Sequence, residues 1–124
     1  MEYESLVRFI RLYGAQSYLA SDVLLRRDLQ WYSDHDRLLI LYGDSKLVAL
    51  VFANPVQSLA FVAEKRFPPD DPMGRFLYVR VLVIHPAYRR RSLINGMLVK
   101  AFMAFPNLEY LVFHRAKRDH QLEL

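Results

Sequence analysis

The segment VLVIHPAYRRRSLINGML, residues 81–98, decides the fold of this chain. A β-branched run ends at Pro86, three arginines follow, and an apolar stretch begins after Ser92. This order predicts a strand, a short basic turn, and a helix whose N-terminus faces the turn. Such a terminus attracts phosphate through its unpaired N–H groups, and neighbouring guanidiniums strengthen the attraction. The segment therefore predicts an anion site at a strand–helix junction.

The same residues resemble the cofactor-binding motif of the GNAT superfamily of acyl-CoA-dependent N-acyltransferases. In that motif a strand leads through His-Pro and an aromatic residue to Arg/Gln-x-x-Gly-x-Gly/Ala and a helix. Here Arg89 stands at the Arg/Gln position, Ser92 at the first glycine and Ile94 at the second small residue. Glycine lets phosphates approach the backbone closely. A serine can still be accommodated, whereas Ile94 is expected to narrow the pocket.

The resemblance implies that acetyl-CoA, or a related acyl-CoA, is the cosubstrate. In the family, loop amides hold the pyrophosphate, and the end of the preceding strand pairs with the pantetheine arm and polarises the acyl carbonyl. The matching cofactor-binding positions are Leu82, Val83, Ile84, Arg89, Arg90, Arg91, Ser92, Leu93 and Ile94. We expect the side chains of the first three to lie in the core, with their main chain contacting the ligand. Ser92 is also the expected helix N-cap.

Composition bounds the class of protein. The 124 residues, 53% of them hydrophobic, favour one domain over residues 1–124 with a substantial core. The absence of cysteine excludes disulfides, thiolate metal sites and a cysteine nucleophile. With no apolar run of about 18 residues and no leader-like start, we expect a cytoplasmic protein away from membranes. The net charge of +4 permits an anionic ligand or nucleic acid and requires neither.

Hydrophobic periodicity predicts the order helix, helix, strand, strand, strand, helix, strand. The second helix is expected over Ala15–Gln30, with Leu19, Val23 and Leu24 inward. The other expected elements are a helix through Leu6–Tyr13, a hairpin of Leu38–Tyr42 and Leu47–Ala53, a strand Phe76–Ile84, a largely buried helix Leu93–Phe105 and a strand Leu108–His114. This order indicates an α/β (α+β) fold: a mixed, mostly antiparallel sheet with a parallel strand–helix–strand unit and flanking helices. It resembles the GNAT core over roughly Asp36 to Arg115.

The resemblance implies an N-acyltransferase that moves an acetyl group to a primary amine of a small molecule or protein. His114 is our candidate general base, whereas His85 is expected to be structural. Enzymes of the family often use a C-terminal tyrosine to protonate the leaving thiolate, and no tyrosine stands at that place here. The four histidines are scattered, so no metal is expected. Two alternatives stay open: a catalytically degenerate module that binds a protein, for instance as a homodimer through an unpaired edge strand, and a basic nucleic-acid-binding domain, which no recognised motif supports.

Overall fold

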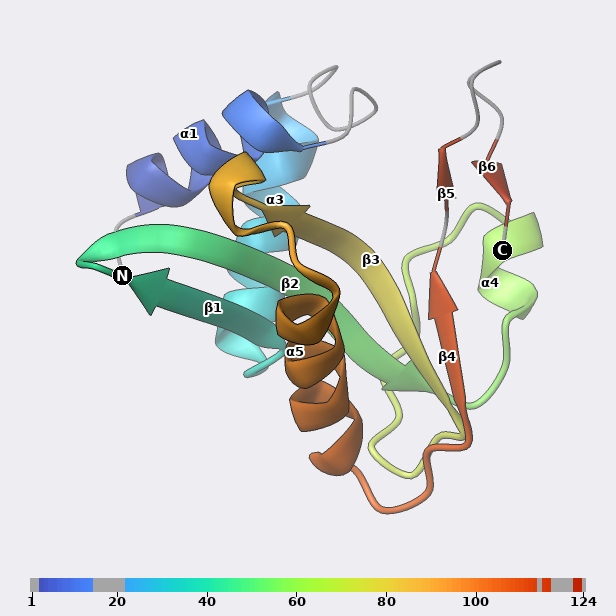
Figure 1. The fold of residues 1–124 in the computed structure, drawn as a ribbon. Coiled ribbons are helices and arrows are strands. Elements are labelled where there is room, and N and C mark those ends of the chain that lie inside the picture. Colours follow the sequence, from blue (N-terminus) through green and yellow to red (C-terminus); the bar gives the residue numbers. More distant parts are fainter. Residues whose placement is uncertain (1–2, 15–21, 114, 117–121, 124) are drawn as a thin grey trace. The chain divides into compact units, whose positions relative to one another are not determined.

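The computed structural model describes residues 3–14, 22–113, 115–116 and 122–123 (Figure 1). Its elements follow the expected order, with a short additional helix after the hairpin and a small additional sheet at the end. They are α1 (Tyr3–Tyr13), α3 (Asp22–Asp34), β1 (Leu38–Gly43), β2 (Lys46–Val56), α4 (Ala60–Ala63), β3 (Phe76–Ile84), the 3-10 helix η1 (Pro86–Tyr88), α5 (Arg91–Met103), β4 (Tyr110–Phe113), β5 (Arg115–Ala116) and β6 (Leu122–Glu123).

Four strands form one mixed sheet in the order β1-β2-β3-β4, and β5 and β6 form a separate two-stranded sheet. β1 and β2 are antiparallel partners, with Leu38 opposite Phe52. β3 and β4 are parallel partners, with Phe76 opposite Tyr110. A parallel pair requires a long crossover connection, and α5 lies within that connection. The predicted fold class and its strand–helix–strand unit are therefore confirmed.

The chain forms two compact units, one of residues 1–52 with 81–90 and the other of residues 53–80 with 91–124. In the first unit, α3 packs against both α1 and β1. The ring of Tyr32 on α3 stacks on Phe52 of β2, with ring centroids 4.9 Å apart. Both side chains are fully buried, so this aromatic pair lies at the centre of the first unit's core.

The buried face of α3 differs from the prediction. Leu25 and Leu29 are fully buried, whereas Val23 is 77% exposed. Leu19 lies outside the described residues. The helix continues to Asp34, so Tyr32 extends the buried row by one turn instead of belonging to a connection. Helical spacing alone could not choose between the two rows, because apolar residues occur in both.

The expectation of a largely buried helix before β4 is wrong. Met97 is the buried residue of α5, whereas Val99 is exposed and Met103 is 79% exposed. A helix that is apolar on nearly all sides can turn only part of its surface toward a sheet. β2 also continues through Asn54 and Pro55 to Val56, beyond the expected end of the strand at Ala53. The Pro55 carbonyl accepts a hydrogen bond from the Asp71 N–H at 2.9 Å.

In the second unit, a cluster of Val56, Phe61 and Tyr78 forms a buried core. Phe61 of α4 meets the Tyr78 ring edge-on, with centroids 4.9 Å apart. Arg75 and Glu109 pair at 2.8 Å immediately before β3 and β4. This ion pair links the starts of the two parallel strands, and its exposure to water keeps its contribution to stability small.

The buried Tyr78 ring predicts a loss of stability at alkaline pH. Burial raises the pKa of Tyr78, and the charge of Arg80 offsets part of that rise. An unfolded tyrosine ionises near pH 10, while folded Tyr78 keeps its proton to higher pH. Below about pH 10, ionisation of Tyr78 therefore does not lower the free energy of unfolding. Above that pH, the free energy of unfolding falls as the pH rises toward the folded-state pKa.

We expect Tyr78→Phe to lose less stability than the wild type between pH 8 and pH 11 in urea titrations. Tyr42→Phe is the matched control, because its side chain is exposed on β1. The control should lose stability with pH as the wild type does. Equal losses in all three proteins would show that Tyr78 has an ordinary pKa.

Candidate functional site

The turn after β3 is fixed by His85. Its backbone N–H donates to the Val48 carbonyl on β2 at 2.8 Å, and its Nδ1 accepts from the Ala87 N–H at 3.1 Å. Because Nδ1 accepts a hydrogen bond, the hydrogen of the neutral ring lies on Nε2. The ring also contacts Tyr13, with centroids 4.8 Å apart. His85 thus caps η1 and holds the turn against its own unit.

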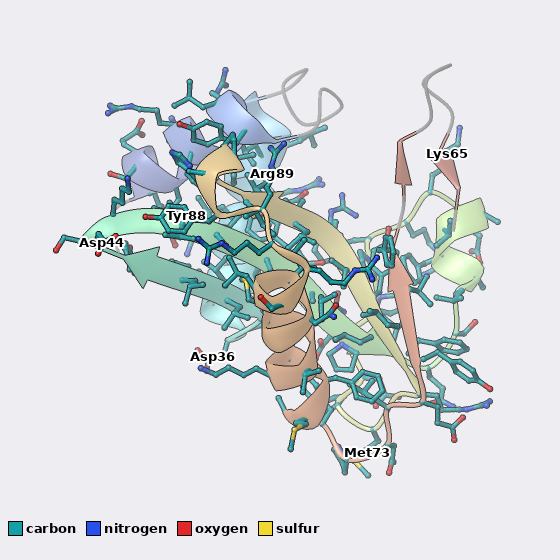
Figure 2. The ribbon with its side chains drawn as sticks, in the orientation of Figure 1. Asp36, Asp44, Lys65, Met73, Tyr88 and Arg89 are labelled. Atoms are coloured by element: carbon teal, nitrogen blue, oxygen red, sulfur yellow. The ribbon has the colours of Figure 1, made fainter. Side chains whose placement is uncertain are left out.

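Tyr88, the last residue of η1, reaches the tip of the β1–β2 hairpin. Its hydroxyl donates to Oδ2 of Asp44 at 3.3 Å, and Figure 2 shows Tyr88 directed toward that tip. The Nζ of Lys46 lies over its ring, 5.6 Å from the centroid. Asp44 and Ser45 both adopt positive φ, which is typical of a tight two-residue hairpin turn. Two segments distant in sequence therefore meet at the tyrosine.

Arg89 and Arg90 follow directly after η1. The Nε of Arg89 donates to the Ile84 carbonyl at the end of β3, at 3.1 Å. The backbone N–H of Arg90 donates to the Tyr88 carbonyl at 2.8 Å. The loop thus closes back on the strand, and both arginine side chains remain exposed.

Arg91 is the first residue of α5, so the helix begins one residue before the expected N-cap. Ser92 lies inside the first turn, and its prediction as the N-cap is wrong. Ser92 follows the start of the helix, because the turn after η1 ends at Arg90, whereas the apolar pattern placed the helix start at Leu93. Ser92 is exposed, whereas Leu93 and Ile94 are half-buried.

The end of β3 also departs from the expectation. Val83 and Ile84 are buried as predicted, but Leu82 is 37% exposed. Side chains of a strand alternate between faces, so Leu82 points away from the face that Val81 and Val83 share. Its prediction as a core side chain is wrong. Residues 81–84 are all apolar, so the sequence does not show which of them alternate between the two faces.

Three consecutive guanidiniums, on Arg89, Arg90 and Arg91, form the basic loop of this chain. Among the described residues none of them is paired with a carboxylate. The first turn of α5, which begins at Arg91, adds N–H groups that no intrahelical carbonyl can satisfy. Cationic forks and backbone donors that are adjacent in the chain are suited to phosphate oxygens.

Other predicted site residues have different outcomes. His114 lies outside the described residues, so its prediction as a general base stays a prediction. The sequence predicts a turn at residues 43–46, but it does not indicate a functional role for Asp44. Its contact with Tyr88 joins residues 44 positions apart, which no local pattern reveals. In the described ranges no group of three or more metal-ligating side chains occurs, and no helix there has the length and apolarity to cross a membrane.

Comparison with solved structures identifies the fold as GNAT-like, which confirms the resemblance seen in the sequence. One similar structure is described as GphF GNAT-like decarboxylase in complex with isobutyryl-CoA, with a TM-score of 0.65 and 20% identity over 93% of this chain. Another is the loading GNATL domain of CurA from Lyngbya majuscula, with a TM-score of 0.64 and 14% identity over 94% of this chain. No protein-family model and no curated protein matches the sequence.

The present chain spans 62% of the GphF chain and 61% of the CurA chain, which is less than two thirds of either. At these identities the likeness defines the architecture alone.

Proposed function

We propose that the chain binds an acyl-CoA through the basic loop Arg89–Arg91 and the first turn of α5. The observation that carries the proposal is three exposed guanidiniums at a helix start, none of them neutralised by a carboxylate among the described residues. The GphF structure, which shares the fold, was solved with isobutyryl-CoA. Diphosphate binding by the loop is the chemistry that both observations support.

We further propose that the bound acyl group is transferred to a primary amine. The amine nitrogen attacks the thioester carbonyl, the carbon–sulfur bond breaks, and the amine proton passes to the leaving thiolate to give an amide and free CoA. Main-chain N–H groups over residues 82–84 would polarise the carbonyl. His114 is the proposed base that relays the proton. The similar structure GphF is described as a decarboxylase. Decarboxylation, unlike acyl transfer, requires no amine.

A titration with acetyl-CoA tests binding directly. Calorimetry and thermal shift should both detect the complex, because a ligand that binds only the folded state raises the melting temperature. Release of free thiol, measured with and without a panel of amines, then tests transfer. Amine-dependent release supports the transfer. Binding without amine-dependent release overturns the transfer and leaves the binding, and the absence of binding at millimolar CoA overturns both.

A second candidate function is protein binding through β4, as in a homodimer. β4 is the last strand of its sheet, and Tyr110, Leu111 and Phe113 on it are all exposed. An uncharged edge strand of this kind is a template for pairing with another strand. Light scattering across a tenfold or greater range of concentration would reveal association. Replacement of Leu111 by lysine should abolish that association if β4 mediates it.

A further inference from the structure

We propose that Asp44, at the tip of the β1–β2 hairpin, is a positioning residue that acts through Tyr88 to hold the basic loop in its phosphate-binding arrangement. The inference rests on the proposed function, because the arrangement that the contact preserves is that of the proposed phosphate-binding loop. The residues from the hairpin tip through Arg90 belong to the first compact unit, whereas Arg91 of the basic loop belongs to the second.

The hairpin tip contacts Tyr88 from three positions. A Cβ added to Gly43 would stand 3.9 Å from Cε1 of Tyr88, so the glycine lies against the ring edge. The Nζ of Lys46 lies over the ring face, and Oδ2 of Asp44 accepts the hydrogen bond of the hydroxyl. Figure 2 shows Asp44, Tyr88 and Arg89 following one another from the hairpin tip toward the loop.

The turn that bears Asp44 has the geometry of a tight hairpin. Asp44 and Ser45 have φ of 52° and 63°, which matches the two central positions of a tight hairpin. The pair Gly43–Lys46 closes the ladder around them. The carboxylate is therefore held at a defined place by the sheet, and Tyr88 is anchored to the sheet in turn.

Backbone hydrogen bonds connect the anchored Tyr88 to the arginines that follow it. The Tyr88 carbonyl accepts the Arg90 N–H, and the Tyr88 N–H donates to the His85 carbonyl at 2.9 Å. Arg89, the next residue, is held by its own bond to the Ile84 carbonyl. Fixing the loop before the ligand arrives removes part of the entropy lost on binding.

Electrostatics alone predicts the opposite sign. A carboxylate beside an anion site repels phosphate, so its removal would tighten binding of CoA. The positioning role predicts weaker binding when the Tyr88–Asp44 bond is lost. The sign of the change therefore separates the two roles.

The test uses three single variants, the double variant that combines Tyr88→Phe with Asp44→Gly, and a control. Tyr88→Phe keeps the ring and removes the hydroxyl. Asp44→Gly removes the carboxylate and tolerates positive φ, and Asp44→Asn keeps an acceptor oxygen in a residue that also tolerates it. Tyr42→Phe, an exposed tyrosine on the same hairpin, is the control. Affinity for acetyl-CoA is measured by calorimetry, and amide hydrogen exchange over residues 85–90 is measured without ligand.

We expect Tyr88→Phe and Asp44→Gly each to weaken binding about 3- to 10-fold, the value of one lost hydrogen bond. Their combination should weaken binding no further. Asp44→Asn should bind at least as tightly as the wild type, and Tyr42→Phe should be unchanged. Exchange over residues 85–90 should quicken in the two weakened single variants and in their combination, and in no other variant.

Several results would overturn the inference. Tighter binding by Asp44→Gly would assign the carboxylate a purely electrostatic effect. Unchanged affinity in Tyr88→Phe, in a protein that binds acetyl-CoA, would leave the contact without a role at the loop. If the wild type binds no acetyl-CoA, the proposed function fails and this role fails with it, while the exchange data still report whether the anchor exists.

Discussion

Replacing Phe52 by alanine is expected to lower the free energy of unfolding by about 3–5 kcal/mol, the usual effect of removing a buried aromatic ring. Phe52 is fully buried on β2 and stacks on Tyr32 at 4.9 Å with an interplanar angle of 13°. The substitution removes that stacking and leaves a cavity between α3 and the sheet. Neighbouring side chains refill it only in part, because the backbone ladder of β1 and β2 limits their movement.

Urea denaturation followed by circular dichroism measures the change. Leu12→Ala on α1 is the control, since Leu12 is an exposed apolar residue of the same unit. Its effect should remain within about 0.5 kcal/mol. A loss below about 1 kcal/mol in the Phe52 variant would contradict the packing of α3 on β2.

Replacing Arg89 and Arg90 together by alanine is expected to weaken acetyl-CoA binding about 100-fold, because in the proposed complex each would form hydrogen bonds to a charged phosphate group. Both side chains are exposed, so the melting temperature of the free protein should change little. Arg89→Lys with Arg90→Lys should give an intermediate affinity, because the charge remains and the bidentate fork is lost.

The control for lost charge is the pair Arg8→Ala and Lys100→Ala. Arg8 lies on the exposed side of α1, and Lys100 lies in the last turn of α5. This double variant removes the same net charge from residues outside the loop. Affinity should then fall only by the long-range effect, which 0.15 M salt largely screens. Equal weakening in both double variants would show that net charge, and not the loop, attracts the ligand.

Local sequence patterns predicted the structural features that depend on residues close together in the sequence. The β-branched run Phe76–Ile84 matches β3 at both ends, and the turn signal at residues 43–46 contains the observed hairpin tip. The crossover between β3 and β4 followed from element order and length. These features are set by backbone preference and by spacing, which a single sequence carries.

Features that depend on which surfaces meet were not predictable. The buried row of α3 is selected by the sheet it packs on, and the exposure of Leu82 is concealed in an uninterrupted apolar run. The proposed cofactor-loop residues follow from the resemblance to the family motif. The contact between Asp44 and Tyr88 required the hairpin and the loop to be placed in three dimensions.

The parallel pairing of β3 with β4 has a consequence for how the protein acquires its structure. Arg75 and Glu109, at the starts of the two strands, are 34 residues apart in sequence. Bringing the two strands together closes a long loop at a cost in chain entropy. We therefore expect β3 to pair with β4 more slowly than the β1–β2 hairpin forms. During synthesis the edge of β3 stays open until β4 leaves the ribosome. Chaperone capture in that interval would be concentrated on nascent chains from which β3 has emerged and β4 has not.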